Sequence, residues 1–340
     1  MLIIPIFVPH AGCPNDCCFC NQKIISGNTS VPDKASVVET ILFYEKIAYR
    51  YDEVQIAFYG GSFTAIESSL QEMFLEAVQP FLKTNGGFID CIRASTRPDC
   101  IDETVIGRLK KYNVSIIELG AQSMDDKVLE MSKRGHNSDA TRRAAKLLKE
   151  AGITLGLQTM TGLPGATAES DKRTACEVAK LEPDLVRIYP TIVIKNTDLC
   201  EWFLRGEYTS PTLEETVELC ADLFEFYDSR NITVIRMGLQ SSDNISDGGD
   251  IASGPYHPAF GQLVKSRIAL RKLVGAIEAT IYTETQGKEL CVNIPTGKCS
   301  DYTGQKKYNS EYIKNKFGFS AVKFYEQDYC KDFPEVFIRQ

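Results

Sequence analysis

Residues 115–165, "SIIELGAQSMDDKVLEMSKRGHNSDATRRAAKLLKEAGITLGLQTMTGLPG", decide the fold that the chain is expected to adopt. They begin inside an apolar, β-branched run (114–122), which predicts a buried strand. "SDATRRAAKLLKEAG" predicts a helix, because its apolar residues from Ala140 to Ala151 fall on one face and Gly152 stops it. A second apolar run follows at 153–160. The stretch therefore predicts one strand–helix–strand unit.

The same alternation extends in both directions along the chain. Further apolar runs predict strands at 2–8, 54–60, 88–95, 185–194 and 232–238, with helical segments between them. Right-handed crossovers wind such units into one parallel sheet, whose buried strands are continuously apolar. Polar residues and glycines follow almost every strand. This favours a full or partial (β/α) barrel over a doubly wound sheet, with the active site at the carboxyl ends of the strands.

Composition narrows the class of protein. Of 340 residues, 43% are hydrophobic and 24% charged, which excludes a disordered or fibrous chain. The net charge of −7 excludes a whole-surface electrostatic grip on nucleic acid. The apolar opening "MLIIPIFVP" is too short to span a bilayer and has no basic segment, so we expect a cytoplasmic protein with no membrane partner. A change of rhythm near residue 240 predicts two domains, a barrel at 1–240 and a smaller α+β module at 241–340.

Four cysteines crowd into "HAGCPNDCCFCNQ" (10–22), namely Cys13, Cys17, Cys18 and Cys20. A C-x3-C-x2-C set offers three thiolates on a short loop, and three ligands on a 4Fe–4S cluster leave one iron open. Zinc is the competing metal, with Cys18 or His10 as the fourth ligand, although adjacent cysteines do not easily chelate one ion. A chance grouping of core cysteines is the other alternative.

The pattern "CPNDCCFC" is similar to the C-x3-C-x-aromatic-C signature of radical S-adenosylmethionine (SAM) enzymes, with Phe19 as the aromatic residue and Cys18 at the variable position. The resemblance implies a partial (β/α)6 TIM-type barrel. It also implies a 4Fe–4S cluster on Cys13, Cys17 and Cys20, with SAM on the remaining iron. It further implies one-electron cleavage of SAM to methionine and a 5′-deoxyadenosyl radical in a cavity that excludes water. A reductant such as flavodoxin or ferredoxin would supply the electron.

The same resemblance places residues from several strand ends around SAM. "FYGGSFTAI" contains what looks like the family's glycine motif, while "IRASTRPDCI" and "IELGAQS" end the next two strands. The implied cofactor contacts are Phe19, Gly60, Gly61, Ser62, Ser95, Arg97 and Gln122. The residues themselves leave alternatives open, since the glycines suit an ordinary tight turn and Arg97 suits an ion pair with Asp99.

Three more features near these strand ends are candidates for the site. Glu118 lies in an apolar run, where a lone buried carboxylate is costly, so it needs a partner or a function. "RGH" (134–136) precedes a helix that we expect Ser138 to cap, and its side chains either point into the barrel mouth or belong to an ordinary capped loop. "TGLPG" (161–165) resembles the family's adenine-contacting turn, and a plain Gly-Pro loop is the alternative.

The run 116–199, which ends in "VRIYPTIVIKNTDL", closely resembles the radical-SAM half of the catalytic subunit of Elongator, which modifies the wobble uridine of tRNA. A weaker resemblance is to oxygen-independent coproporphyrinogen oxidase. The resemblance implies radical chemistry on an RNA base, with tRNA as partner. The same chemistry on a small molecule such as a tetrapyrrole, or a non-catalytic iron–sulfur protein that binds RNA, are the alternatives. Residues 241–340 show no acetyl-CoA pyrophosphate loop, so Elongator's acetyltransferase chemistry is not expected in this chain.

The segment "LCVNIPTGKCSDYTGQKKYNSEYIKNKFGFSAVKFYE" (290–326) predicts strand, helix, basic loop, helix and strand. This order resembles a KH module, in which a G-x-x-G loop clamps the nucleotide backbone. The loop here runs from Gly304 through Lys306 to Lys307, so lysine replaces the second glycine. Six lysines against two acidic residues between 298 and 323 give a local charge of +4 that can hold phosphates. A solvated helix face is the alternative.

Overall fold

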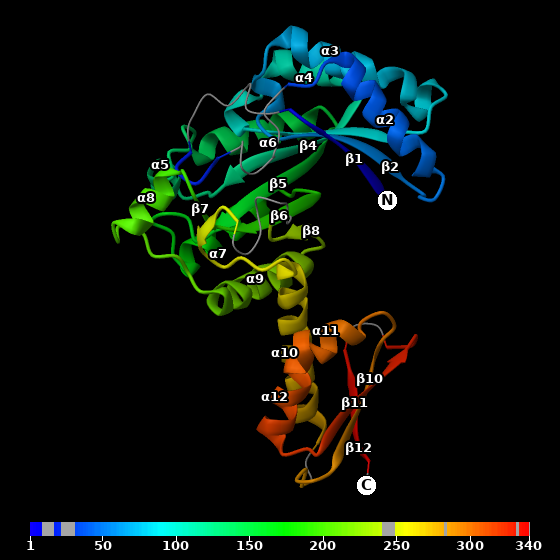
Figure 1. The fold of residues 1–340 in the computed structure, drawn as a ribbon, viewed down its shortest axis with the longest axis vertical. Coiled ribbons are helices and arrows are strands. Elements are labelled where there is room, and N and C mark those ends of the chain that lie inside the picture. The colour runs from blue at the N-terminus through cyan, green and yellow to red at the C-terminus, as the bar shows by residue number, and fades with distance from the viewer. Residues whose placement is uncertain (9–16, 22–30, 240–248, 282–283, 331–332, 340) are drawn as a thin grey trace. The chain divides into compact units, whose positions relative to one another are not determined.

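The structure is a computed structural model, and it describes residues 1–8, 17–21, 31–239, 249–281, 284–330 and 333–339 (Figure 1). The chain forms two compact units. The first contains Met1–Thr212 and Phe226–Pro258, and the second contains Leu213–Glu225 and Ala259–Gln340. The division therefore falls after Pro258, and not at residue 240, and the start of helix α9 (Leu213–Asp228) groups with the second unit. None of the described helices is long and apolar enough to cross a membrane.

The first unit is built on one parallel sheet, as the sequence predicts. Its strand order is β1-β2-β3-β4-β5-β6-β8, so neighbours in sequence are neighbours in the sheet. Each predicted apolar run supplies one strand of this sheet, and the seven strands give six successive strand–helix units followed by a last strand. The strands are β1 (Leu2–Phe7), β2 (Val54–Tyr59), β3 (Cys91–Thr96), β4 (Val114–Gln122), β5 (Thr154–Thr161), β6 (Leu185–Pro190) and β8 (Thr233–Met237).

The sheet curls into a half-barrel with an apolar outer face and a polar inner face. On β4, Ile117 and Leu119 are completely buried on the outer face, whereas Glu118 belongs to the inner face. Arg187 of β6 donates a hydrogen bond to the hydroxyl of Tyr59 on β2, although β3, β4 and β5 separate the two strands. Such a contact is possible only because the inner face is concave.

Helices follow the strands and cover the outer face, and Figure 1 shows α2, α3 and α4 along one side of the fan of strands. The helix predicted after "RGH" is α6, which ends before Gly152 in its left-handed conformation. Its cap differs from the prediction: Asn137, and not Ser138, accepts the capping hydrogen bond from the Ala140 amide at 3.1 Å. The helices are α2 (Lys34–Ala48), α3 (Ser68–Val78), α4 (Glu103–Lys111), α5 (Asp126–Met131), α6 (Ser138–Glu150), α7 (Ala168–Lys180) and α8 (Asp198–Leu204).

Residues 249–258, at the end of the first unit, include one short strand. This strand, β9 (Ile251–Ser253), pairs antiparallel with β7 (Val193–Ile194). Tyr256 then packs against Ile192 and Ile194 in a small apolar cluster. This segment therefore returns to the first unit before the chain enters the second.

The second unit contains the predicted strand–helix–loop–helix–strand order. Helix α10 (Phe260–Thr280) precedes β10 (Glu289–Pro295), α11 (Cys299–Thr303), the 3-10 turn η5 (Gln305–Lys307), α12 (Tyr308–Phe317), β11 (Ala321–Gln327) and β12 (Glu335–Arg339). The sheet order is β11-β10-β12, with β10 parallel to β11 and antiparallel to β12. Strand β12 was not expected from the sequence. The core joins Leu273 and Ile277 of α10 to Leu290 and Val292 of β10 and to Ile313 of α12.

Candidate active site at the carboxyl ends of the strands

The described part of the cysteine loop contains Cys17, Cys18 and Cys20, while Cys13 and His10 lie outside the described residues. The Cys20 amide donates to the Cys17 carbonyl oxygen at 3.0 Å, so the two predicted cluster ligands share one tight turn. Cys17 is buried and Cys20 is half-buried. Two thiols on one turn suit a metal cluster held by thiolates.

Cys18 has a different environment from its neighbours. Its side chain is 1% exposed, and burial, with Cys17 next to it, raises the pKa of its thiol to about 12. Its amide donates to the Ser132 carbonyl oxygen at 3.2 Å, and its carbonyl oxygen accepts the Leu199 amide at 2.8 Å. Cys18 therefore anchors the loop as a neutral thiol between the segment before α6 and the start of α8.

Arg134 of the "RGH" run contacts the cysteine loop directly. Its Nη1 donates to the sulfur of Cys17 at 3.2 Å, and its Nη2 donates to the carbonyl oxygen of Gly120 on β4 at 2.6 Å. A guanidinium donor next to a sulfur ligand offsets the negative charge of a metal-bound thiolate. The sequence singled out this run but did not assign Arg134 to the site. No local signal in the sequence could have assigned it, because the contact joins residues that lie 117 positions apart.

His136 is the third residue of that run, and its hydrogen-bond partner is the neighbouring Asn137 and not the described part of the cysteine loop. It is half-buried, and burial, followed by the charge of Arg134, lowers its pKa to about 4. The ring Nδ1 lies 3.3 Å from the Asn137 carbonyl oxygen. His136 is therefore a neutral side chain at neutral pH.

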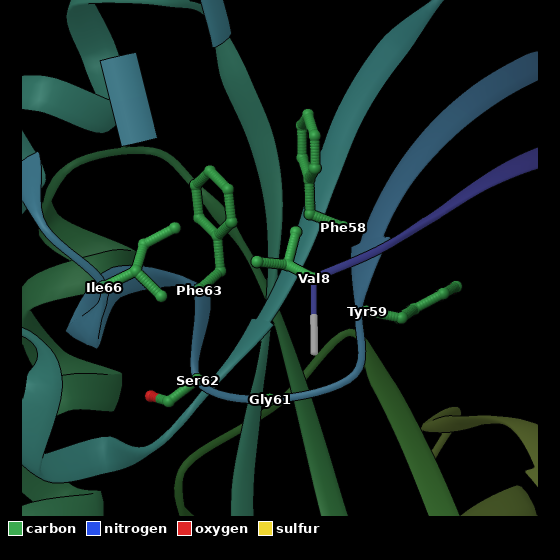
Figure 2. A pocket seen from close by; sticks show the side chains of 7 residues that line it. All are labelled: Val8, Phe58, Tyr59, Gly61, Ser62, Phe63 and Ile66. Atoms are coloured by element: carbon green, nitrogen blue, oxygen red, sulfur yellow. The ribbon is translucent and has the colours of Figure 1, made fainter. Parts of the chain in front are cut away.

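The glycine motif after β2 forms a turn that side chains would block. Gly60 has a φ of 98°, and a Cβ added there would lie 3.2 Å from the Val8 carbonyl oxygen. Figure 2 shows the small pocket under this turn, where Tyr59 points away from Phe58 and Phe63. The rings of Phe58 and Phe63 stack at 4.7 Å on the apolar side. Tyr59 thus faces the inner side of the sheet and the glycines follow it.

Ser62 ties the ends of β2 and β3 together. Its hydroxyl lies 2.8 Å from the Thr96 hydroxyl and accepts the Arg97 amide at 3.1 Å. Thr96 also shares a hydrogen bond with Thr64 at 2.6 Å. The Ser62 hydroxyl is buried in this network, so its contacts within the chain fix the shape of the turn.

Arg97 forms the ion pair that the sequence left as the alternative to a cofactor contact. Its Nε and Nη2 donate to the two carboxylate oxygens of Asp99 at 3.0 and 2.8 Å. Nη2 also donates to the Arg134 carbonyl oxygen at 2.6 Å. Arg97 therefore holds the backbone of the residue that contacts Cys17. Ser95, two residues before it, is half-buried on the inner face of β3.

Gln122 ends β4 in a left-handed conformation, with a φ of 66°. The ladder between β4 and β5 shifts register here, between Gly120 and Gln122. The buried Gln122 side chain accepts a hydrogen bond from the amide of Gln158 at 3.4 Å. A Cβ on Gly120 would lie 2.9 Å from Nε2 of the Gln122 side chain, so glycine at position 120 leaves room for that side chain.

Phe19 packs against an apolar cluster at α8, and the "TGLPG" turn forms hydrogen bonds with residues of and near α7 and α8. Phe19 packs, partly buried, against a cluster that includes Leu199 and Tyr208. Tyr208 donates its hydroxyl to the Gly162 carbonyl oxygen at 2.7 Å, and Asp171 accepts the Gly162 amide at 3.0 Å. Burial raises the pKa of Asp171 to about 7. The turn is therefore held from both sides.

Glu118 has the partners that its burial requires. It pairs with Arg93 of β3 at 2.7 Å and with Arg187 of β6, whose Nη2 lies 3.0 Å from Glu118 Oε1. Arg93 in turn donates to Gln55 of β2 at 2.8 Å. The two arginines and one glutamate carry a net charge of +1 on the inner face.

The C-terminal loop has an unusual backbone for its residue types. Lys306 and Lys307 both have left-handed conformations, with φ of 51° and 63°, and both are exposed. A Cβ on Gly304 would lie 2.9 Å from the Asn309 amide nitrogen, so the loop needs glycine there. The two lysines make no ion pair within the described chain. Most of the other lysines of the basic segment do: Lys314 with Glu311, Lys316 with Glu278 and Lys323 with Glu289.

The described residues give a consistent donor set for part of a metal centre. No three His, Cys, Asp or Glu side chains gather as metal ligands in the part of the chain that the structure describes, and Cys13 lies outside that part. Cys17 and Cys20 on one turn, with the Arg134 guanidinium at Cys17, fit a cluster held by thiolates. Sulfur ligands next to a cationic donor suit iron–sulfur chemistry.

Comparison with protein families decides the class. The model of the radical SAM superfamily matches residues 7–175, and the model of the radical SAM C-terminal domain matches residues 183–269. The chain belongs to the radical SAM superfamily. A radical SAM enzyme uses a 4Fe–4S cluster and SAM, so these are its cofactors, and the glycine turn and the cysteine loop lie at the sheet end where the family's chemistry takes place.

Relatives of this radical SAM protein include tRNA-modifying proteins. A tRNA uridine(34) acetyltransferase of Methanocaldococcus infernus is 28% identical over 64% of this chain and 48% of its own length. Elongator complex protein 3 of Mus musculus is 26% identical over 52% of this chain and 36% of its own. The chain thus spans about half or less of the length of these relatives.

A solved structure supports the fold. The archaeal Elp3 of Methanocaldococcus infernus, with residues 1–46 deleted, matches with a TM-score of 0.64 and 24% identity, over 80% of this chain and 63% of its own. The half-barrel is therefore the architecture of the radical SAM fold, as the sequence predicted.

Proposed function

We propose that this radical SAM enzyme modifies a base of tRNA. The observation that carries the proposal is the similarity, over about two thirds of the chain, to a protein named for tRNA uridine(34). In this proposal Cys13, Cys17 and Cys20 hold the 4Fe–4S cluster, which with SAM supplies the 5′-deoxyadenosyl radical when both are bound. Cys18 keeps the loop in place and does not bind iron.

The chain's own residues divide into those that contact SAM and those that position them. The backbone of Gly60 and Gly61 and the side chains of Phe19, Ser95 and Gln122 contact SAM in this proposal. Ser62 and Arg97 act differently, because the Ser62 hydroxyl already bonds to Thr96, and Nε and Nη2 of Arg97 already bond to Asp99 and to the Arg134 carbonyl oxygen. They fix the ends of β2 and β3, so that the contacting groups keep their geometry.

The second unit holds RNA through Gly304, Lys306 and Lys307. Two exposed lysines without carboxylate partners in the described chain are suited to phosphates, and both belong to a loop with left-handed backbone. Lys314, Lys316 and Lys323 already form ion pairs with carboxylates. The positive charge of the basic segment that is not paired with a carboxylate in the described chain is therefore that of the loop lysines. A small electron-transfer protein such as flavodoxin or ferredoxin supplies the electron.

The test is anaerobic reconstitution of the full chain with iron, sulfide, SAM and dithionite, followed by measurement of 5′-deoxyadenosine with and without bulk tRNA. We expect tRNA to stimulate formation. Turnover that tRNA does not change would favour a small-molecule substrate such as a tetrapyrrole. No turnover at all would favour a non-catalytic iron–sulfur protein that binds RNA.

A further inference from the structure

Two tyrosines of the second unit are exposed next to the loop that carries Lys306 and Lys307. Tyr308, the first residue of α12, is 53% exposed, and Tyr312, one helical turn later, is 40% exposed. Their rings lie nearly parallel, at an interplanar angle of 25° with the centroids 6.3 Å apart. In contrast, Tyr302 of the same unit is buried in the core. The pair therefore forms an aromatic surface that the core of this unit does not use.

The opposite face of α12 is fixed to the rest of the second unit. Ile313 is completely buried in its core. The buried Asn309 follows Tyr308, and its Nδ2 donates to the Ser266 carbonyl oxygen on α10 at 2.9 Å and to the Asp301 carbonyl oxygen on α11 at 3.2 Å. The backbone that carries the tyrosines is therefore held in place. A surface that is already ordered loses less conformational entropy when a ligand binds to it.

The charge beside the two rings indicates the class of ligand. Lys306 and Lys307 directly precede Tyr308, are exposed, and make no ion pair within the described chain. Glu311, which lies between the two tyrosines in sequence, is paired with Lys314. The other lysines between 298 and 323 are also paired: Lys298 with Asp301, Lys316 with Glu278 and Lys323 with Glu289. Unpaired positive charge next to the rings favours a polyanion.

A single-stranded nucleic acid presents both groups that this surface can contact. Its phosphates are negative, and its unpaired bases have flat faces that stack on aromatic side chains. In a duplex the bases are stacked on one another, so their faces are not available to a protein surface. Lysines without an aromatic neighbour would hold either form, whereas lysines followed by two exposed rings favour the single strand.

We propose that Tyr308 and Tyr312 stack against bases of a single-stranded RNA segment whose phosphates contact Lys306 and Lys307. The inference rests on the proposed function, because it specifies which form of RNA the second unit holds. Stacking accepts every base, since each has a flat face. The surface should therefore distinguish unpaired from paired RNA, and depend little on sequence.

The test measures the Kd of the reconstituted full chain for a fluorescein-labelled RNA of about 16 nucleotides by fluorescence anisotropy. The strand contains only adenosine and cytidine, so it does not pair with itself. The same strand annealed to its complement is the duplex probe. Both Kd values are measured over a range of salt concentrations. The wild type should bind the single strand more tightly than the duplex.

The variants separate stacking from charge. Tyr308→Ala and Tyr312→Ala should each raise the Kd for the single strand about fivefold or more, because each removes one ring. They should leave the Kd for the duplex and the dependence on salt unchanged, because a tyrosine carries no charge. Lys306→Ala with Lys307→Ala should instead weaken binding of both probes and make the dependence on salt less steep.

Two control variants show whether the ring at this position is what matters. Tyr308→Phe keeps the ring and removes only the hydroxyl, so its Kd for the single strand should equal that of the wild type. Tyr49→Ala removes a tyrosine of the first unit that is 76% exposed, and should change neither Kd. A loss in Tyr308→Phe or Tyr49→Ala as large as in Tyr308→Ala would overturn the inference.

The remaining outcomes distinguish this inference from the proposed function. Equal Kd values of the wild type for the two probes, or an unchanged Kd for the single strand in both alanine variants, would overturn the inference. If bulk tRNA still stimulates 5′-deoxyadenosine formation, the proposed function then stands. No binding of either probe would also overturn the inference, and would favour a protein partner for the tyrosine surface. Selective loss of single-strand binding in the alanine variants supports it, even where tRNA leaves turnover unchanged and the proposed function alone fails.

Discussion

The two faces of strand β4 differ although they share one backbone. Ile117 and Leu119 are fully buried on the outer face, where helices α4 and α6 pack. Glu118 and Gln122 belong to the inner side, where each is buried with polar partners. Alternation along a strand separates the two sets. The outer face stabilises the fold by excluding water, while the inner face carries buried charges that depend on their ion pairs and hydrogen bonds.

The largest expected effect comes from breaking the inner-face ion pairs. Glu118→Gln leaves Arg93 and Arg187 facing a neutral amide, and removing one partner of a buried pair costs about 3–5 kcal/mol. The free energy of unfolding in urea measures this. Glu177→Gln is the control, since its pair with Arg142 is partly exposed and is worth about 0–1 kcal/mol. Equal losses in the two variants would contradict the contrast between buried and exposed charge.

On the outer face, Leu119→Ala should reduce the free energy of unfolding by about 2–5 kcal/mol, because it removes apolar volume from a site with no exposure. Unlike Glu118→Gln, which changes the inner face, Leu119→Ala changes only the apolar packing of the outer face. Below its unfolding temperature the variant should keep 5′-deoxyadenosine formation near that of the wild type. A folded Leu119→Ala protein without activity would show that the outer face also shapes the site.

Asp171 gives a pH dependence whose sign follows from burial. Its pKa is about 7 in the folded chain and near 3.9 when unfolded, so the folded state binds the extra proton between these values. The contribution to stability is complete below about pH 4 and is lost as the pH rises through about 7. Relative to Asp171→Asn, the wild type should lose of the order of a few kcal/mol over that window. Parallel stability curves for the two proteins would contradict it.

The smallest effect on folding is expected at the loop of the second unit. Lys306→Ala with Lys307→Ala should change stability by no more than about 0.5 kcal/mol, because both side chains are exposed and make no ion pair within the described chain. Binding of tRNA should weaken, and its dependence on salt should become less steep by about 1–2 in logarithmic slope. Lys314→Ala, which removes a lysine paired with Glu311, is the control and should change the slope less.

Much of the fold followed from local patterns. Each apolar run contains a strand of the parallel sheet, because strands buried on both faces are continuously apolar. "SDATRRAAKLLKEAG" contains α6, because a helix that buries one face repeats its apolar residues every three or four positions. A short strand or a strand at the edge of a sheet has too few buried residues for either pattern to be recognised. Strands β9 and β12 were therefore not foreseen, and the cap of α6 moved by one residue, from Ser138 to Asn137.

The site was harder to predict, since its contacts join distant parts of the chain. The Arg97–Asp99 pair is local and was weighed from the sequence as an alternative. The contact of Arg134 with Cys17 spans 117 residues, and that of Arg187 with Tyr59 spans 128. No local pattern specifies such pairs. They arise only when the sheet curls and brings strand ends together.

Iron content and visible absorption of anaerobically reconstituted Cys17→Ala and Cys18→Ala proteins distinguish the cluster ligand from its neighbour. Cys17→Ala should lose the brown 4Fe–4S chromophore, whereas Cys18→Ala, which lacks only a buried anchoring thiol, should keep four irons per chain as in the wild-type 4Fe–4S protein. If the wild-type protein takes up zinc instead of iron, or if Cys17→Ala keeps its cluster while Cys18→Ala loses it, Cys17 is not a ligand of a 4Fe–4S cluster.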